Sequence, residues 1–191
     1  MKFYNQTRLS DDVLIPVVKH AARAIRAKHG KVLIIVRRSR SYGRSSGYME
    51  DADWVSRSFI AKRKYTKSSG YTDEREGHIK CKGLIVLRIP KARLGSWAGE
   101  GQQAKGTARN FFKLALHEWG HIYDMQKGRK FDQYNRNHRN RPHERRAEQY
   151  VKDIMDKPLP KEVERALGQL EHALYTEALE KEKHDVEKAE R

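Results

Sequence analysis

The sequence has almost no cysteine, with Cys81 alone among 191 residues. A single thiol excludes an internal disulfide and any zinc site built from several cysteines. We expect Cys81 to be a small buried side chain rather than a reactive thiol. The N-terminal segment also lacks the apolar core of a signal peptide, so the sequence predicts a cytoplasmic protein.

Long hydrophobic runs are absent as well. The longest apolar stretches, at 32–36 and 84–87, fall far short of the roughly 20 residues that cross a bilayer as a helix. Hydrophobic residues make up 37% of the chain and charged residues 35%, so the apolar side chains must be concentrated in an economical core. We expect one domain over 1–157, no membrane span, and a charged helix over 158–191 that packs on the domain or extends from it.

Acidic residues are too few to balance the basic ones. The chain has 41 Lys and Arg against 25 Asp and Glu, a net charge of +16, which attracts polyanions or acidic proteins. Two basic stretches, 36–68 and 127–146, contain interleaved aromatic residues, a composition that suits phosphate contact and base stacking. No known nucleic-acid-binding motif accompanies them. The candidate contacts to DNA or RNA are Arg37, Arg38, Arg40, Arg44, Arg136, Arg139 and Arg141.

The first ninety residues predict one helix followed by strands. An amphipathic helix is expected from Asp11 to just before Gly30, and a buried β-branched strand follows over 31–38. Residues 38–52 have the composition of a loop. Further strands are expected over 54–65 and 78–90.

The second half of the chain predicts helices. Thr107 is the expected N-cap of a long helix over 108–127, and Pro142 suits the first turn of a helix over 142–156. A last helix is expected from about Pro160 into the 180s. Strands therefore precede helices, which predicts an α+β fold.

The predicted helix over 108–127 contains the pattern H-E-x-x-H, formed by His117, Glu118 and His121. Residues four apart lie above one another on one helical face, so both imidazoles can reach one metal ion. Glu118 projects beside them and is the candidate general base, because it can accept a proton from a metal-bound water. The alternative is that both histidines are ordinary surface residues and Glu118 pairs with an arginine.

Two histidines leave a catalytic zinc site without its third protein ligand. A further histidine at the spacing H-E-x-x-H-x-x-G-x-x-H is excluded, because Asp124 and Lys127 occupy those positions. The other source is a carboxylate of the following helix, and Glu144 is the candidate. Glu148, one turn further, is placed to hold a ligand histidine by its second ring nitrogen. Alternatively, both glutamates only pair with neighbouring arginines.

These two motifs, HEWGH at 117–121 and ERRAE at 144–148, resemble those of the gluzincin (thermolysin-like) zinc metallopeptidases. The resemblance implies one Zn²⁺ bound by His117, His121 and Glu144. It also implies that Glu118 is the general base and that Glu148 supports the ligands. Asp124 is a second candidate for that supporting role.

The resemblance further implies a zincin-like fold, in which a small mixed sheet with an edge strand precedes the HExxH helix and the glutamate helix. The strand over 83–89 would be the edge strand that pairs with an extended substrate. The implied reaction is peptide hydrolysis, in which zinc activates a water and polarises the scissile carbonyl while Glu118 carries the proton to the leaving amine.

The residue that stabilises the oxyanion is left open among four neighbours in the sequence, Tyr134, His138, His143 and Tyr150. The leading hypothesis is a zinc peptidase acting on proteins or peptides, including acidic or nucleic-acid-associated ones. The alternative hypothesis is a basic nucleic-acid-binding protein with a structural or non-catalytic metal site. A third hypothesis is an interaction factor that uses the charged C-terminal helix.

Overall fold

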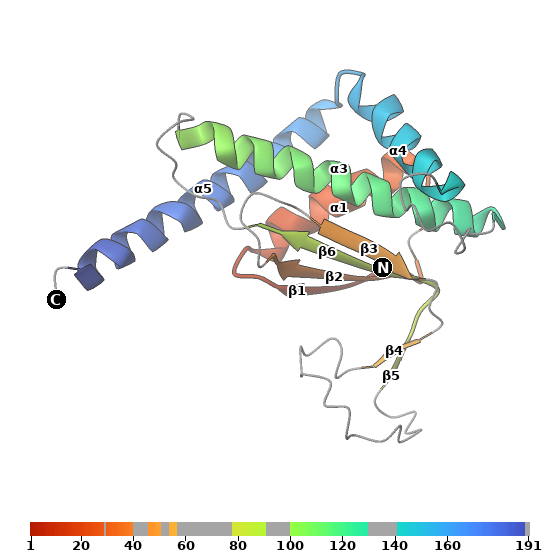
Figure 1. Ribbon diagram of the computed structural model, residues 1–191, viewed down its shortest axis with the longest axis horizontal. Helices are drawn as coiled ribbons and strands as arrows, with labels where there is room; N and C mark the ends of the chain where they lie inside the picture. Colours follow the sequence, from red (N-terminus) through yellow and green to blue (C-terminus); the bar gives the residue numbers. More distant parts are fainter. Residues whose placement is uncertain are drawn as a thin grey trace.

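The computed structural model describes residues 1–28, 30–39, 46–50, 54–56, 78–90, 100–129 and 141–189. Within these ranges the chain is mixed α+β, as the sequence predicts, with helices layered over one face of a small sheet (Figure 1). The elements are β1 (Lys2–Gln6), α1 (Asp11–Ile25), β2 (Leu33–Arg38), β3 (Ser46–Glu50), β4 (Trp54–Ser56), β5 (His78–Lys80), β6 (Leu84–Ile89), α3 (Glu100–Gln126), α4 (Pro142–Met155) and α5 (Lys161–Ala189). No helix in this described part combines the length and the apolar character that crossing a bilayer would need.

The main sheet has the strand order β1–β2–β6–β3. The first three strands are parallel, and β3 runs antiparallel to β6 along one edge. The interior strands β2 and β6 are buried on both faces and therefore consist of nearly continuous apolar residues. The short antiparallel pair β4–β5 lies on the far side of this sheet from the helices (Figure 1).

Alternate residues of the interior strands enter two separate cores. Ile34 and Ile85 face the helices and belong to the main core, whose largest buried side chains include Phe111 of α3. The intervening Ile35 and Val86 belong to a smaller core on the other face of the sheet. This period of two is the ordinary consequence of strand geometry, and it fixes the sheet beneath α3.

The first half of the C-terminal helix α5 packs into the main core. Buried residues of α5 that join the main core are Val163, Ala166, Leu167, Leu170 and Leu174. Its second half extends beyond the sheet (Figure 1) and carries the exposed Val186. Helix α5 thus packs on the main core with its first half and extends beyond it with its second, while the division of the chain at residue 157 stays a prediction.

The prediction that the strand over 83–89 forms the sheet edge was wrong. That strand is β6, which lies between β2 and β3, and the described edge strand is β3. Residues 46–50 were expected to be loop because serine and glycine dominate the local pattern. Pairing with β6 overrides this weak local preference.

Three other strand predictions also differ from the structure or reach beyond the described residues. The strand predicted over 78–90 is divided into β5 and β6 by Gly83, whose φ of 120° is accessible mainly to glycine. The strand predicted over 54–65 is described only at Trp54–Ser56, and 57–65 lie outside the described residues. The N-terminal strand β1 was not predicted.

The helix predictions were closer to the structure. Helix α1 starts at Asp11 as expected, with the side chain of Ser10 accepting a hydrogen bond from the backbone N–H of Asp12. Helix α4 starts at Pro142 as expected. Helix α3 starts at Glu100, so Thr107 lies inside it and the predicted N-cap was wrong.

Candidate metal centre

Helices α3 and α4 cross in close contact at Gly120 and Ala147. A Cβ atom added to Gly120 would lie 3.3 Å from Ala147 Cα and 2.9 Å from Tyr150 Cδ2, so any larger residue there would force α4 or the Tyr150 ring to shift. Gly120 lies between the two histidines of the motif, and Glu144 precedes Ala147 by about one turn. The crossing therefore brings Glu144 to the histidine-bearing face of α3.

Three predicted ligands converge on one point. The Nε2 atoms of His117 and His121 are 3.1 Å apart, Glu144 Oε2 lies 3.1 Å from His117 Nε2, and Glu144 Oε1 lies 3.6 Å from His121 Nε2. Ligand atoms that share a tetrahedral ion at about 2.0–2.1 Å lie roughly 3.3 Å from one another. The cluster of His117, His121 and Glu144 could therefore hold a metal ion.

The surroundings of Glu144 and His117 shift their pKa values in opposite directions. Burial raises the pKa of Glu144, but hydrogen bonds and positive charge from His117 and His121 outweigh this and hold it far below its usual range. Burial lowers the pKa of His117, whereas its hydrogen bond with Glu144 and the charges of Glu118, Glu144 and Glu148 raise it overall. Proton and metal thus compete for the same imidazole nitrogen.

Glu118 lies buried beside the cluster, with 4% of its surface exposed. Burial, together with the charge of Glu144, raises its pKa to about 7 despite the opposing effect of His117. A carboxyl group with a pKa near neutrality can both accept and return a proton under ordinary conditions. The environment of Glu118 therefore suits a general base.

The edge strand β3 passes directly over Glu118 at Gly47. A Cβ atom at Gly47 would lie 3.1 Å from Glu118 Oε1, 3.1 Å from Leu114 Cδ1 and 2.9 Å from the carbonyl oxygen of Val86. The absence of a side chain at Gly47 therefore leaves room for the Glu118 carboxylate. The sequence analysis did not identify Gly47 as part of the site, because it lies in a serine- and glycine-rich stretch that was expected to be a loop.

The two residues expected to support the ligands differ in their surroundings. Glu148 is exposed on α4, and its charge helps to raise the pKa of His117, but support of a ligand ring nitrogen stays a prediction. Asp124 is 1% exposed and accepts hydrogen bonds from Arg129, Arg146 and Tyr150. These partners place Asp124 at the joint between α3 and α4.

The four candidates for oxyanion stabilisation differ in how close they lie to the ligand cluster. His143 is buried next to the cluster, with its Nε2 3.3 Å from Glu144 Oε1 and its ring centroid 5.5 Å from that of His121. The Tyr150 hydroxyl donates to Asp124 and accepts from Arg129, so it belongs to the helix joint. Tyr134 and His138 lie outside the described residues.

Some of the arginines expected to contact nucleic acid have other partners. Arg38, with 15% of its side chain exposed, forms an ion pair with Glu177 of α5 and donates to the carbonyl of Pro90, a position that does not support contact with a phosphate. Arg37 donates to Gln6 Oε1, and Arg141 is the half-buried residue before α4. The remaining four candidates, Arg40, Arg44, Arg136 and Arg139, lie outside the described residues.

Comparisons of this chain with protein-family models, with curated proteins and with solved structures found no match. Membership of the gluzincins therefore stays a prediction from the two motifs. Function is inferred from the geometry and chemistry of the chain's own residues.

Proposed function

We propose that this protein is a zinc-dependent peptidase of the gluzincin type. The observation that carries the proposal is the convergence of His117, His121 and Glu144 from two consecutive helices, with a buried glutamate beside them. Two imidazoles and one carboxylate form a known donor set of catalytic zinc sites, in which the fourth position stays open for water or substrate.

The donor atoms fit Zn²⁺ in type and in spacing. Imidazole nitrogen and carboxylate oxygen are both common zinc ligands. The two imidazole nitrogens lie 3.1 Å apart, and Glu144 Oε2 lies 3.1 Å from His117 Nε2, while the other Glu144 oxygen lies 3.6 Å from His121 Nε2. One donor atom from each residue thus lies within 4.8 Å of the other two. The side chain of His117 is 22% exposed, whereas that of Glu144 is 8% exposed. The coordination position left for water or substrate is therefore expected on the side of His117. A bound zinc ion would lower the pKa of its water and polarise a substrate carbonyl.

In this proposal Glu118 transfers the proton from the attacking water to the leaving amine. Its carboxylate is buried next to His117, and its pKa of about 7 lets it take a proton from the attacking water and then donate it to the leaving amine. Gly47 leaves the carboxylate room beneath the edge strand.

An extended peptide segment is the substrate class that suits this arrangement. In the described part of the chain, β3 pairs with β6 alone, so its other edge offers backbone groups for an added strand. A peptide bound along β3 would run close to Glu118, because a Cβ atom built on Gly47 of the same strand would lie 3.1 Å from Glu118 Oε1. The edge strand in this proposal is β3 rather than the strand over 83–89.

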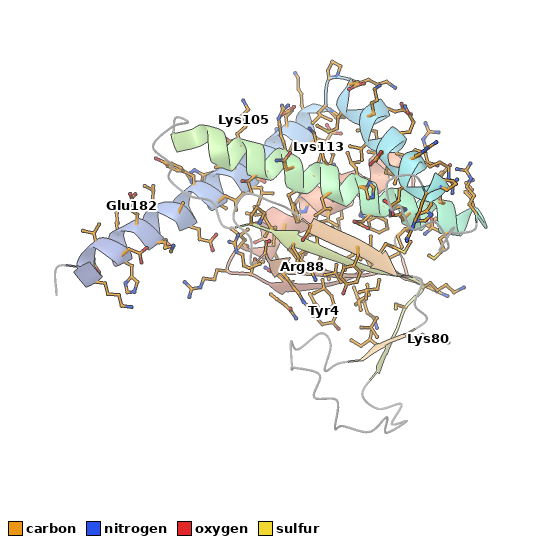
Figure 2. The ribbon with its side chains drawn as sticks, viewed as in Figure 1. Tyr4, Lys80, Arg88, Lys105, Lys113 and Glu182 are labelled. Atoms are coloured by element: carbon orange, nitrogen blue, oxygen red, sulfur yellow. The ribbon has the colours of Figure 1, made fainter. Side chains whose placement is uncertain are left out.

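The experiment is hydrolysis of fluorescently labelled casein by the purified, zinc-loaded chain. Glu118→Gln should abolish hydrolysis while zinc stays bound, because the amide cannot act as the base but is not a ligand. Glu182→Gln is the matched control, since Glu182 lies on the projecting end of α5 (Figure 2), and it should leave both properties unchanged. Failure of the zinc-loaded chain to cleave casein or a mixed peptide library would overturn the proposal.

Nucleic-acid binding, the alternative hypothesis, is supported by the net charge of +16 and stays a prediction. A fluorescence-anisotropy titration with DNA and RNA at low salt tests it directly. Absence of binding at low salt would exclude this alternative.

A further inference from the structure

Outside the ligand cluster itself, two of the contacts between α3 and α4 bear on the position of Glu144. The first is the close approach of Gly120 and Ala147. The second lies about one helical turn further along α3, where the carboxylate of Asp124 is buried against α4. The first limits the distance between the helices, and the second restrains the angle between them.

Asp124 is the centre of the second contact. Arg146 Nε donates to its Oδ2 atom, and Tyr150 Oη donates to its Oδ1 atom over 2.8 Å. Arg129, just beyond the end of α3, donates to Asp124 Oδ1 and to Tyr150 Oη, each over 2.9 Å. Two of these three partners belong to α4, the helix that carries Glu144.

A single contact at Gly120 and Ala147 would let α4 pivot. Glu144 is three residues from Ala147, or about 4.5 Å along the helix axis, so a swing of about 10° would move its backbone by about 0.8 Å. Metal–ligand distances tolerate deviations of only about 0.2 Å. Contacts away from the pivot must therefore hold the angle of α4, and besides the packing of Tyr123 against Tyr150 the hydrogen bonds to Asp124 are the polar ones among them.

We propose that Asp124 is a positioning residue for the metal site, which fixes the angle of α4 through Arg146 and Tyr150 and thereby the place of the Glu144 carboxylate. The inference rests on the metal site of the proposed function. It gives Asp124 a role that differs from the one expected from its sequence position, because Asp124 acts on the helix that carries the third ligand rather than on a histidine.

If Asp124 contributed to stability alone, its replacement would lower stability and leave the metal site unchanged. The test therefore measures the coordination geometry and the metal affinity of the site. The full-length chain is loaded with Co²⁺, whose visible absorption spectrum reports coordination geometry, and the Kd for Zn²⁺ is measured by competition with a chelator. The variants are Asp124→Asn and Tyr150→Phe, which removes the hydroxyl but keeps the ring against Gly120. Leu170→Ala, a truncation in the core on α5, is the control for lost stability.

Asp124→Asn is expected to weaken zinc binding by about 10- to 100-fold and to alter the Co²⁺ spectrum. Tyr150→Phe should have a smaller effect that disappears in the Asp124→Asn background, because both act through one contact. Leu170→Ala should lower the unfolding midpoint without changing the Kd of the folded protein. Should Asp124→Asn fail to fold, Tyr150→Phe alone must show the weaker Kd.

A wild-type Kd and a wild-type Co²⁺ spectrum in Asp124→Asn, or in Tyr150→Phe where the former does not fold, would overturn the inference. That result would leave the proposed function intact if Glu118→Gln still abolished hydrolysis. Conversely, a metal-binding chain that cleaves no peptide would overturn the proposed function, while altered spectra of the variants would still support the positioning role of Asp124.

Discussion

The substitution Gly120→Ala tests the close approach of α3 and α4 with a single methyl group. Alanine is favoured over glycine inside a helix by about 1 kcal/mol. The new Cβ, however, would meet Ala147 Cα at 3.3 Å and Tyr150 Cδ2 at 2.9 Å. Overpacking of this kind costs about 1–3 kcal/mol, so we expect net destabilisation of up to about 2 kcal/mol. Because Glu144 moves with α4, zinc binding should also weaken.

Two other helical glycines provide matched controls. A Cβ atom at Gly106 of α3 or at Gly168 of α5 would meet nothing within 4 Å. Alanine at either position should therefore raise the free energy of unfolding by about 0.5–1 kcal/mol. Urea unfolding and chelator competition measure the two effects. If Gly120→Ala stabilised the protein as much as Gly106→Ala and left the Kd for zinc unchanged, the proposed tight crossing would be wrong.

Three further predictions follow from other contacts. Gly47→Ala would bring its Cβ to 2.9 Å from the carbonyl oxygen of Val86 and to 3.1 Å from Glu118 Oε1, so it should disturb the pairing of β3 with β6, displace the Glu118 carboxylate and lower kcat for peptide hydrolysis while the zinc content stays the same. Arg38→Ala should reduce stability to urea by about 1–3 kcal/mol, because it leaves Glu177 with an unpaired, partly buried charge, and the loss should be smaller in a Glu177→Gln background. The buried Asp124 has a pKa below its usual value, because hydrogen bonds from Arg146, Tyr150 and Arg129 outweigh the effect of burial. The ionised Asp124 therefore stabilises the fold above its unfolded pKa of about 3.9, and this stabilisation is lost as the pH falls through the lower folded pKa. Asp124→Asn should make the urea midpoint decline less steeply below about pH 4. A decline as steep as that of the wild-type chain would contradict this.

The residues of the metal centre could be predicted because their signals are local. Helical spacing alone places His117 and His121 on one face, and helix α4 brings Glu144 to that face. The pattern could not reveal how closely the helices approach. Gly120 and Asp124 matter because they contact residues of α4, which begins more than fifteen residues further along the chain.

The sheet was harder to predict because strand order depends on long-range pairing. The apolar run of β6 indicates a buried strand but not its neighbours, and the structure places it in the interior. Edge strand β3 has few apolar residues. Gly47 is required there by the carbonyl oxygen of Val86 and by Glu118, both of which are far from it in sequence. Helix α3 extends back to Glu100 through Gly101 and Gly106, which locally suggest a loop.

The most direct test of the proposed metal site is the zinc content of the purified chain, measured by elemental analysis beside His117→Ala and Glu144→Ala. We expect one zinc ion per wild-type chain and its loss in both variants, because each removes one of three ligands. Zinc retained by Glu144→Ala would show that the third ligand lies elsewhere. Absence of zinc from the wild-type chain, even after reconstitution, would contradict the metal site and the peptidase proposal that depends on it.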